Sequence, residues 1–465
     1  MATQHVIRGG GLRRLLGWAT LIVTVLFAML AMEHAAVLFT DRLELESHLH
    51  AWLTSSEYIF GEGSIRYAYA SYHAGPVKMA LHMALGGSAM LLGVTQFVPR
   101  LRRRYPKLHR GVGVFVWVAT LLSMIGAMIH LTVTPMADVA SGPAFWLALW
   151  LLAALTLFVL GQAIASVRAR DFRSHMIWMA MVFACLGTAP GLRIDWVVFY
   201  WLLPHNHEWI NLGTTGFVLL QTIFVMTVWL HWTGDADLPV KRRIMGAPEL
   251  TTPLAERVVV GLSAMTAVVA VHEGVLVGMG LDLLQAWRAP IDVLPMIAAG
   301  YALAVAATMT RMPAMWRSAV QGAGPTWSTG GLVGLIALCA IMAGLYADQS
   351  TLATFSVAAV WIGYGGYVLC NLGMAALQTT SRAGRNGWWT TTLATLWAPA
   401  LWPFVLLPGI GLGATFSEAN YAALLAVAAV LAMGGVAVGY GARLVVPFRP
   451  AHHAVQPNRT QHRAT

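Results

Sequence analysis

HMALGGSAMLLGVTQFVPRLRRRYPKLHRGVGVFVWVA, residues 82–119, consists of two apolar stretches joined by a short basic loop. The cations of this loop are Arg100, Arg102, Arg103, Arg104, Lys107 and Arg110. A helix of about twenty apolar residues spans the hydrocarbon core of a bilayer. Lysine and arginine concentrate in the loops on the cytoplasmic side. The stretch therefore predicts two membrane-spanning helices that are joined in the cytoplasm.

Apolar stretches and short polar loops alternate along all 465 residues, of which 58% are hydrophobic and only 10% are charged. A soluble domain has about 25% charged residues. Barrel strands would show a strict alternation of apolar and polar residues, and that pattern is absent from the sequence. We predict an all-α, polytopic transmembrane helical bundle of about 12 spans, at 15–40, 76–98, 110–133, 144–167, 175–200, 211–233, 256–281, 291–310, 328–347, 352–375, 390–408 and 419–442.

The charges of the loops predict the orientation of these spans. Every second loop is basic, so these loops and both termini are expected in the cytoplasm, whereas the acidic loop 41–75 is expected outside. The net charge of +10 belongs to the basic loops, which argues against a nucleic acid as partner. The expected partner is the lipid bilayer, and the expected location is the cell membrane, the inner membrane of a bacterium.

A polar loop with two prolines divides the chain near its middle. We expect a six-span, histidine-rich membrane domain at 1–240, a cytoplasmic linker at 241–255 and a second six-span membrane domain at 256–445. The basic segment 446–465 is expected to be a disordered tail. Two halves of equal orientation are what a parallel repeat requires.

Three histidines are expected at similar depth near the outer face. His34 lies near the end of the first span, His82 early in the second and His130 near the end of the third. A histidine within a bilayer needs a partner, a cavity or a ligand. These three residues, with Glu33, are therefore candidate ligands of a divalent metal, and the histidines are candidate ligands of haem b. The alternative is that they bond to water or backbone at the interface.

Small residues follow His82 on one helix face, at Gly86, Ala89 and Gly93. Such a face leaves space for a flat macrocycle, and it equally permits close packing of a neighbouring helix.

Two further histidines open spans at the inner side, where His109 begins the third span and His175 the fifth. They are candidates for binding a second cofactor or the headgroup of a quinone or an anionic lipid, and the alternative is that they reach toward the interface beside basic loops. His109 and His130 are about 31 Å apart along one helix, which favours a single site near one surface. In the fifth span, Pro190-Gly191 predicts an interruption of the helix, where Arg193 and Asp195 line a pocket or form an interfacial salt bridge.

The region 76–200 resembles a bacterial family of predicted membrane proteins, domain of unknown function 2306. The family pattern has a histidine, a Leu-Gly step, a later glycine, a Gln-Phe pair, a basic loop that ends in LHR-x-x-G, and an HR-x-WM motif. The matching residues are His82, Leu85, Gly86, Gly93, Gln96, Phe97, Leu108, His109, Arg110, Gly113, His175, Trp178 and Met179. The chain has Met176 where the family pattern has arginine. The resemblance implies a helical membrane protein and no particular activity.

The residues leave several functions open, and they do not decide whether the protein is an enzyme. Our first hypothesis is a redox protein that binds haem or a metal near the outer face, with a quinone or a redox protein as partner. The alternatives are a secondary transporter, a metal-dependent membrane hydrolase that uses Glu33 or Asp195, and a non-catalytic assembly factor. The sequence contains no P-loop, GxSxG or HExxH motif, so nucleotide hydrolysis and zincin chemistry have no support.

Overall fold

The computed structural model describes residues 10–233, apart from 41, 43, 63, 65–70, 136–137, 140 and 216, together with 359, 362, 363, 365, 366, 369 and 370. Within this part the regular structure is helical. The elements are α1 (Gly10–Val37), α2 (Leu45–Leu53), α3 (Ser56–Phe60), α5 (Pro76–Gly93), η1 (Val94–Phe97), α6 (Pro99–Arg104), α7 (Pro106–Val133), α8 (Gly142–Arg168), α9 (Phe172–Leu202), α10 (His207–Thr215) and α11 (Val218–Thr233). The predicted linker, second domain and tail lie almost wholly outside the described residues.

Five of these helices are long and apolar enough to cross a membrane, at Gly17–Val37, Pro76–Phe97, Pro106–Val133, Ala148–Arg168 and Ser174–Leu202. For the described part of the chain, they confirm the all-α class and the first five predicted spans. The sixth predicted span differs, because the chain from 207 to 233 forms two helices, α10 and α11, and the apolar part of α11 is only Gln221–Leu230. The total of twelve spans and the position of the termini stay predictions.

Apolar side chains remain exposed along the outside of the bundle, as lipid contact requires. On α1 they recur at helical spacing at Leu15, Trp18, Ile22, Leu26 and Met29. A second row follows α7, at Val114, Trp117, Val118, Leu122, Ile125 and Ile129. Exposed rows of this size are unfavourable in water, so these helices are membrane helices.

Glycines allow α1, α5 and α7 to approach each other closely. A methyl group at Gly87 of α5 would lie 2.8 Å from the carbonyl oxygen of Ala28 in α1, and one at Gly126 of α7 would lie 2.9 Å from the carbonyl oxygen of Lys78. Gly86 faces the Ser123 hydroxyl, and the ring of Phe183 fills the space beside Gly93. The face of α5 with the small residues is therefore used for helix packing. A macrocycle, which was the other predicted use of this face, has no space there.

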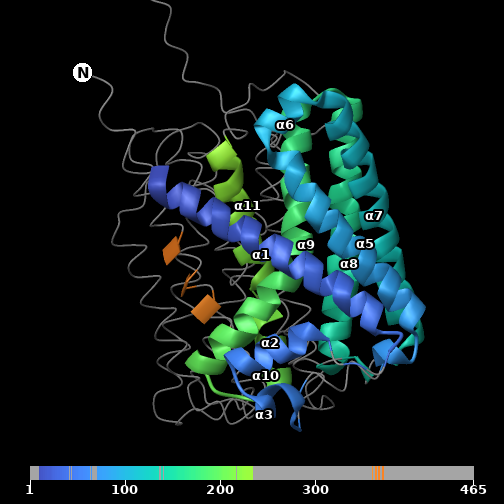
Figure 1. Cartoon of the computed structure of the whole chain (residues 1–465), viewed down its shortest axis with the longest axis vertical. Coiled ribbons are helices and arrows are strands. Elements are labelled where there is room, and N and C mark those ends of the chain that lie inside the picture. Colours follow the sequence, from blue (N-terminus) through green and yellow to red (C-terminus); the bar gives the residue numbers. More distant parts are fainter. Residues whose placement is uncertain are drawn as a thin grey trace, which may run out of the picture.

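Helix α9 passes through the centre of the bundle, between α8 and α11 (Figure 1). The predicted interruption at Pro190 is wrong, because α9 is continuous from Phe172 to Leu202 with this proline inside it. Proline removes one backbone hydrogen bond of a helix, and its ring crowds the carbonyl group four residues earlier. The packing on both sides of α9 maintains the helix. Gly191 allows α11 to approach closely, because a methyl group at this position would lie only 2.8 Å from Val218.

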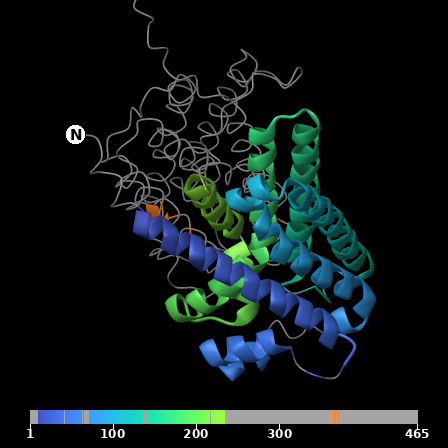
Figure 2. The same ribbon diagram turned by 45° about the horizontal axis from the view of Figure 1, so that its top comes forward.

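The short helices divide between the two ends of the bundle. Helices α2, α3 and α10 lie together at one end, and α6 lies at the other (Figure 1). The turned view also shows α2 and α3 against that end, beyond the long α1 (Figure 2). We call the end with α2, α3 and α10 the capped end, and we call the opposite end the α6 end. By the predicted orientation, the capped end is the outer one.

Candidate functional site

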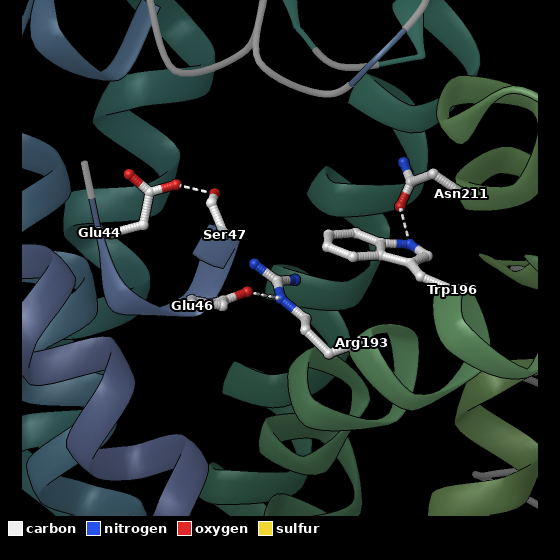
Figure 3. Close-up of polar contacts among 6 residues, drawn as sticks. All are labelled: Glu44, Glu46, Ser47, Arg193, Trp196 and Asn211. Atoms are coloured by element: carbon white, nitrogen blue, oxygen red, sulfur yellow. Dashed lines mark hydrogen bonds and ion pairs between the residues drawn. The ribbon is translucent and has the colours of Figure 1, made fainter. Parts of the chain in front are cut away.

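A buried ion pair connects α9 with α2 at the capped end (Figure 3). Arg193 Nε donates a hydrogen bond to Glu46 Oε1 at 2.7 Å, and the Glu46 side chain is only 3% exposed. The guanidinium also lies over the ring of Trp196, 4.5 Å from its centroid, and over Phe27 at 5.6 Å. Its charge is thus balanced by a carboxylate and by two aromatic faces.

The carboxylate of Glu33 positions α2 for this contact. Both of its oxygens accept from the backbone N–H of Leu45, at 3.3 and 3.4 Å. Leu45 is the first residue of α2, and a negative charge is favourable at a helix N-terminus. At the same end, the Ser47 hydroxyl donates to the carboxylate of Glu44.

Trp196 is the centre of an aromatic cluster with two histidines. Its ring is 5.7 Å from His50 of α2 and 4.4 Å from His207 of α10, between centroids. Its Nε1 donates to Asn211 Oδ1 at 3.1 Å, as Figure 3 shows. The hydroxyl of Tyr58 in α3 donates to the Trp196 carbonyl oxygen at 3.3 Å. The three short helices of the capped end, α2, α3 and α10, therefore all contact this one residue of α9.

Burial sets the charge state of the groups that lie outside the spans. Burial lowers the pKa of His50, and it lowers the pKa of His207 to about 3. Burial raises the pKa of Tyr58 and of Tyr72. Burial would also raise the pKa of Glu46, but the charge and hydrogen bond of Arg193 outweigh it and hold this pKa below its usual value. At neutral pH the cluster therefore combines one ion pair with neutral imidazoles and phenols.

The predicted ligands His34 and His130 both lie beside Tyr72. The ring of Tyr72 is 6.3 Å from that of His34 and 5.3 Å from that of His130, between centroids. Both histidines are buried. His34 lies within electrostatic range of Glu44, Glu46 and Arg193 as well. The structure thus places these two histidines in one neighbourhood at the capped end.

His82 is oriented by α7. Its Nδ1–H donates to the Ser123 carbonyl oxygen at 3.0 Å, and the Ser123 hydroxyl donates to the His82 carbonyl oxygen at 2.8 Å. His82 lies within electrostatic range of His130 and of Arg193. The bond at Nδ1 fixes the orientation of the His82 ring against α7.

In the described part of the chain, no group of three or more histidine, cysteine, aspartate or glutamate residues is arranged to hold a metal ion. Glu33 is engaged at the start of α2. The predicted metal ligands His34, His82, His130 and Glu33 therefore stay a prediction, as do haem and the roles of His109 and His175.

The salt bridge predicted as one alternative for Arg193 and Asp195 is wrong. Arg193 pairs with Glu46, and Asp195 Oδ1 instead accepts from Gln221 Nε2 of α11 at 2.9 Å. Residues two apart on a helix point in different directions. The pair was therefore adjacent only in the sequence.

Sequence reasoning missed Glu46, His50 and Trp196 as members of the site. One signal was present, because Glu46 and His50 are four residues apart in LESHLHAWL and share a face of a short helix. His207 of α10 also belongs to the site, because the structure places it against Trp196.

At the α6 end, His109 and His175 lie within electrostatic range of each other and of Arg102. His175 Nδ1–H donates to the Ala163 carbonyl oxygen of α8 at 2.9 Å. Met176, which stands where the family pattern has arginine, contacts Arg102 Nη1 through its sulfur at 3.2 Å. A cation from α6 thus lies next to the position where α9 lacks one.

The helices from α5 to α11 include the part of the chain that matches a known protein family. Residues 79–230 match the model of the family described as predicted membrane protein (DUF2306). The match confirms the resemblance and extends it from 200 to 230, through α10 and into α11. No curated protein matches the chain, and no solved structure matches it.

The DUF2306 segment contains only part of the capped-end site. Arg193, Trp196 and His207 lie inside it, whereas Glu46 and His50 come from α2, which precedes it. The matched family is described only as predicted membrane proteins, and this description gives no activity.

Proposed function

We propose that the protein is a membrane redox protein that binds haem b near the capped end, with His82 as an axial ligand. The observation that carries the proposal is the hydrogen bond from His82 Nδ1 to the Ser123 carbonyl oxygen. Histidines that bind a metal usually donate their other ring N–H to a carbonyl or a carboxylate, which fixes the tautomer and the ring orientation.

The surroundings of His82 supply what else haem needs. His130 lies in the same neighbourhood, and the cation Lys78 lies within electrostatic range of it. Cations stabilise the carboxylate groups that haem carries. Helix packing fills the face of α5 at Gly86 and Gly93, so the macrocycle would have to bind at another side of His82.

Haem suits these residues better than a bare metal ion does. Haem iron takes only one or two ligands from the protein, whereas a catalytic zinc takes three and a structural zinc four. Because no three candidate ligands converge among the described residues, a one- or two-ligand centre is the more economical proposal. The continuous α9 removes the helix interruption that supported the transporter alternative, and Glu33, which the hydrolase alternative needs, is engaged at the start of α2.

The test is the optical spectrum of the whole protein, purified in detergent after expression with ample haem. We expect a reduced-minus-oxidised difference spectrum with a Soret band and iron close to one equivalent. His82→Ala should abolish the band, and His130→Ala should weaken or shift it. His73→Ala is the matched control, because His73 is exposed just before α5. Absence of haem and of stoichiometric iron in the wild-type protein would refute the proposal, and so would an unchanged spectrum in His82→Ala.

A further inference from the structure

Four polar side chains from four different elements lie at the α6 end. They are Gln96 of η1, Arg102 of α6, His109 of α7 and His175 of α9, which we call the inner cluster. Both histidines lie within electrostatic range of Arg102. Gln96 lies against α7, because a methyl group at Gly113 would be 3.3 Å from its Oε1. Gly113 is one helical turn beyond His109 and on the same face.

The inner cluster has buried hydrogen-bonding atoms without partners. Gln96 is only 6% exposed, and its amide nitrogen Nε2 has no hydrogen-bond partner among the described residues. The same holds for His109 Nδ1. A buried amide without a partner is unfavourable. Such groups in native proteins usually contact a bound ligand or a water molecule.

The charge around the inner cluster indicates the kind of ligand. The segments 94–113 and 163–179 contain many cations and a single carboxylate, Asp171. That carboxylate is already engaged, because it accepts from the Ser174 backbone N–H at 3.0 Å and from the Ser174 hydroxyl at 2.6 Å. The cluster therefore offers N–H donors and positive charge. This combination suits an oxyanion, whereas a neutral quinone has no use for the cations.

We propose that the inner cluster binds a phosphate group, with Arg102 and Gln96 as hydrogen-bond donors to its oxygens. The group belongs either to an anionic phospholipid of the leaflet that borders the α6 end or to a soluble phosphate. Arginine is well suited to phosphate, because its planar guanidinium donates two parallel hydrogen bonds. The site is at the opposite end of the bundle from His82, and the proposal does not depend on haem.

The first experiment identifies the ligand with the full chain in detergent. The apparent unfolding temperature is followed by tryptophan fluorescence while short-chain phosphatidylglycerol, short-chain diacylglycerol or inorganic phosphate is added. We expect phosphatidylglycerol to raise the unfolding temperature and diacylglycerol to leave it unchanged. An equal effect of inorganic phosphate assigns the site to soluble phosphate, and no effect of it assigns the site to the lipid. If neither phosphate compound stabilises the protein, the proposal is wrong.

A charge-matched pair of variants separates a defined site from a diffuse basic surface. Arg102→Gln should weaken phosphate binding about tenfold, since a hydrogen bond to a charged group is lost. Arg103→Gln removes the same charge from an exposed neighbour and should change binding less than about twofold. Equal weakening by both variants would show that the basic loop attracts phosphate without a specific site.

Gln96→Leu tests whether the amide serves a ligand or the fold. Leucine has a similar size and no unpaired donor, so the unfolding temperature without ligand should stay the same or rise. The stabilisation by the phosphate compound should fall. A variant that unfolds at a lower temperature and still binds phosphate normally would show that Gln96 has a structural role only, and it would overturn the assignment.

Discussion

At the level of single residues, the capped end depends on Arg193. This one side chain contacts Glu46 of α2, the ring of Trp196 and the ring of Phe27. Burying one charge without a counter-charge is costly, so the carboxylate of Glu46 holds α2 against α9. Hydropathy marks Arg193 as an unusual residue in a span. It does not identify the counter-charge, because Glu46 lies 147 residues away in the sequence.

The burial of His207 against Trp196 predicts that the protein is less stable in mild acid. Burial lowers the pKa of His207 to about 3 from the ordinary value of 6.5. Between these values the unfolded chain binds more protons than the folded protein, so stability rises with pH in this window and is fully present above pH 6.5. The free energy of unfolding should fall by about 1 kcal/mol between pH 6.5 and 5.5.

The check is denaturant unfolding at several pH values, followed by tryptophan fluorescence. His207→Phe retains the ring contact with Trp196 and should remove most of this pH dependence. A smaller dependence should remain, because burial lowers the pKa of His50 as well. His73→Phe, at an exposed position, should retain the full dependence. An undiminished dependence in His207→Phe would show that other groups cause it.

At the level of helices, the sequence left one choice open that the structure decides. The small face of α5 was compatible with a macrocycle or with a neighbouring helix, because glycine permits both. Gly86 faces Ser123 and Gly93 faces Phe183, so helix packing occupies this face. A single sequence does not contain this answer, since it depends on which helices become neighbours.

The contact between α5 and α7 predicts a specific response to an added methyl group. In Gly126→Ala the new Cβ would lie 2.9 Å from the Lys78 carbonyl oxygen and 3.2 Å from the His82 amide nitrogen. Both are backbone atoms, so α5 must move. We expect a loss of about 2 kcal/mol in the free energy of unfolding. Gly111→Ala, on the same helix with nothing within 4 Å, should be neutral or slightly stabilising. Equal stability of the two variants would contradict the packing.

At the level of the whole molecule, the first five spans and the helical class could be predicted because apolar length is a local property of the sequence. The short helices at the capped end could not, since their positions depend on contacts such as those of Tyr58 and His50 with Trp196. The family resemblance did not supply them, because the match begins at 79 and α2 and α3 precede it. The site is thus assembled from the segment that matches the DUF2306 model and from helices outside it.

The orientation of the molecule is the prediction on which the surroundings of both sites depend. The cation-rich α6 end should face the cytoplasm, and the capped end should face outward. Glu62 and Arg103 are both exposed, the first just after α3 and the second in α6. In a chain whose own cysteines are replaced by alanine, Glu62→Cys should react with a membrane-impermeant maleimide in intact cells. Arg103→Cys should react only after the membrane is permeabilised. The reverse pattern would show that the charge rule fails for this protein, and it would place the haem ligand proposed at His82 near the cytoplasmic surface and the inner cluster against the outer leaflet.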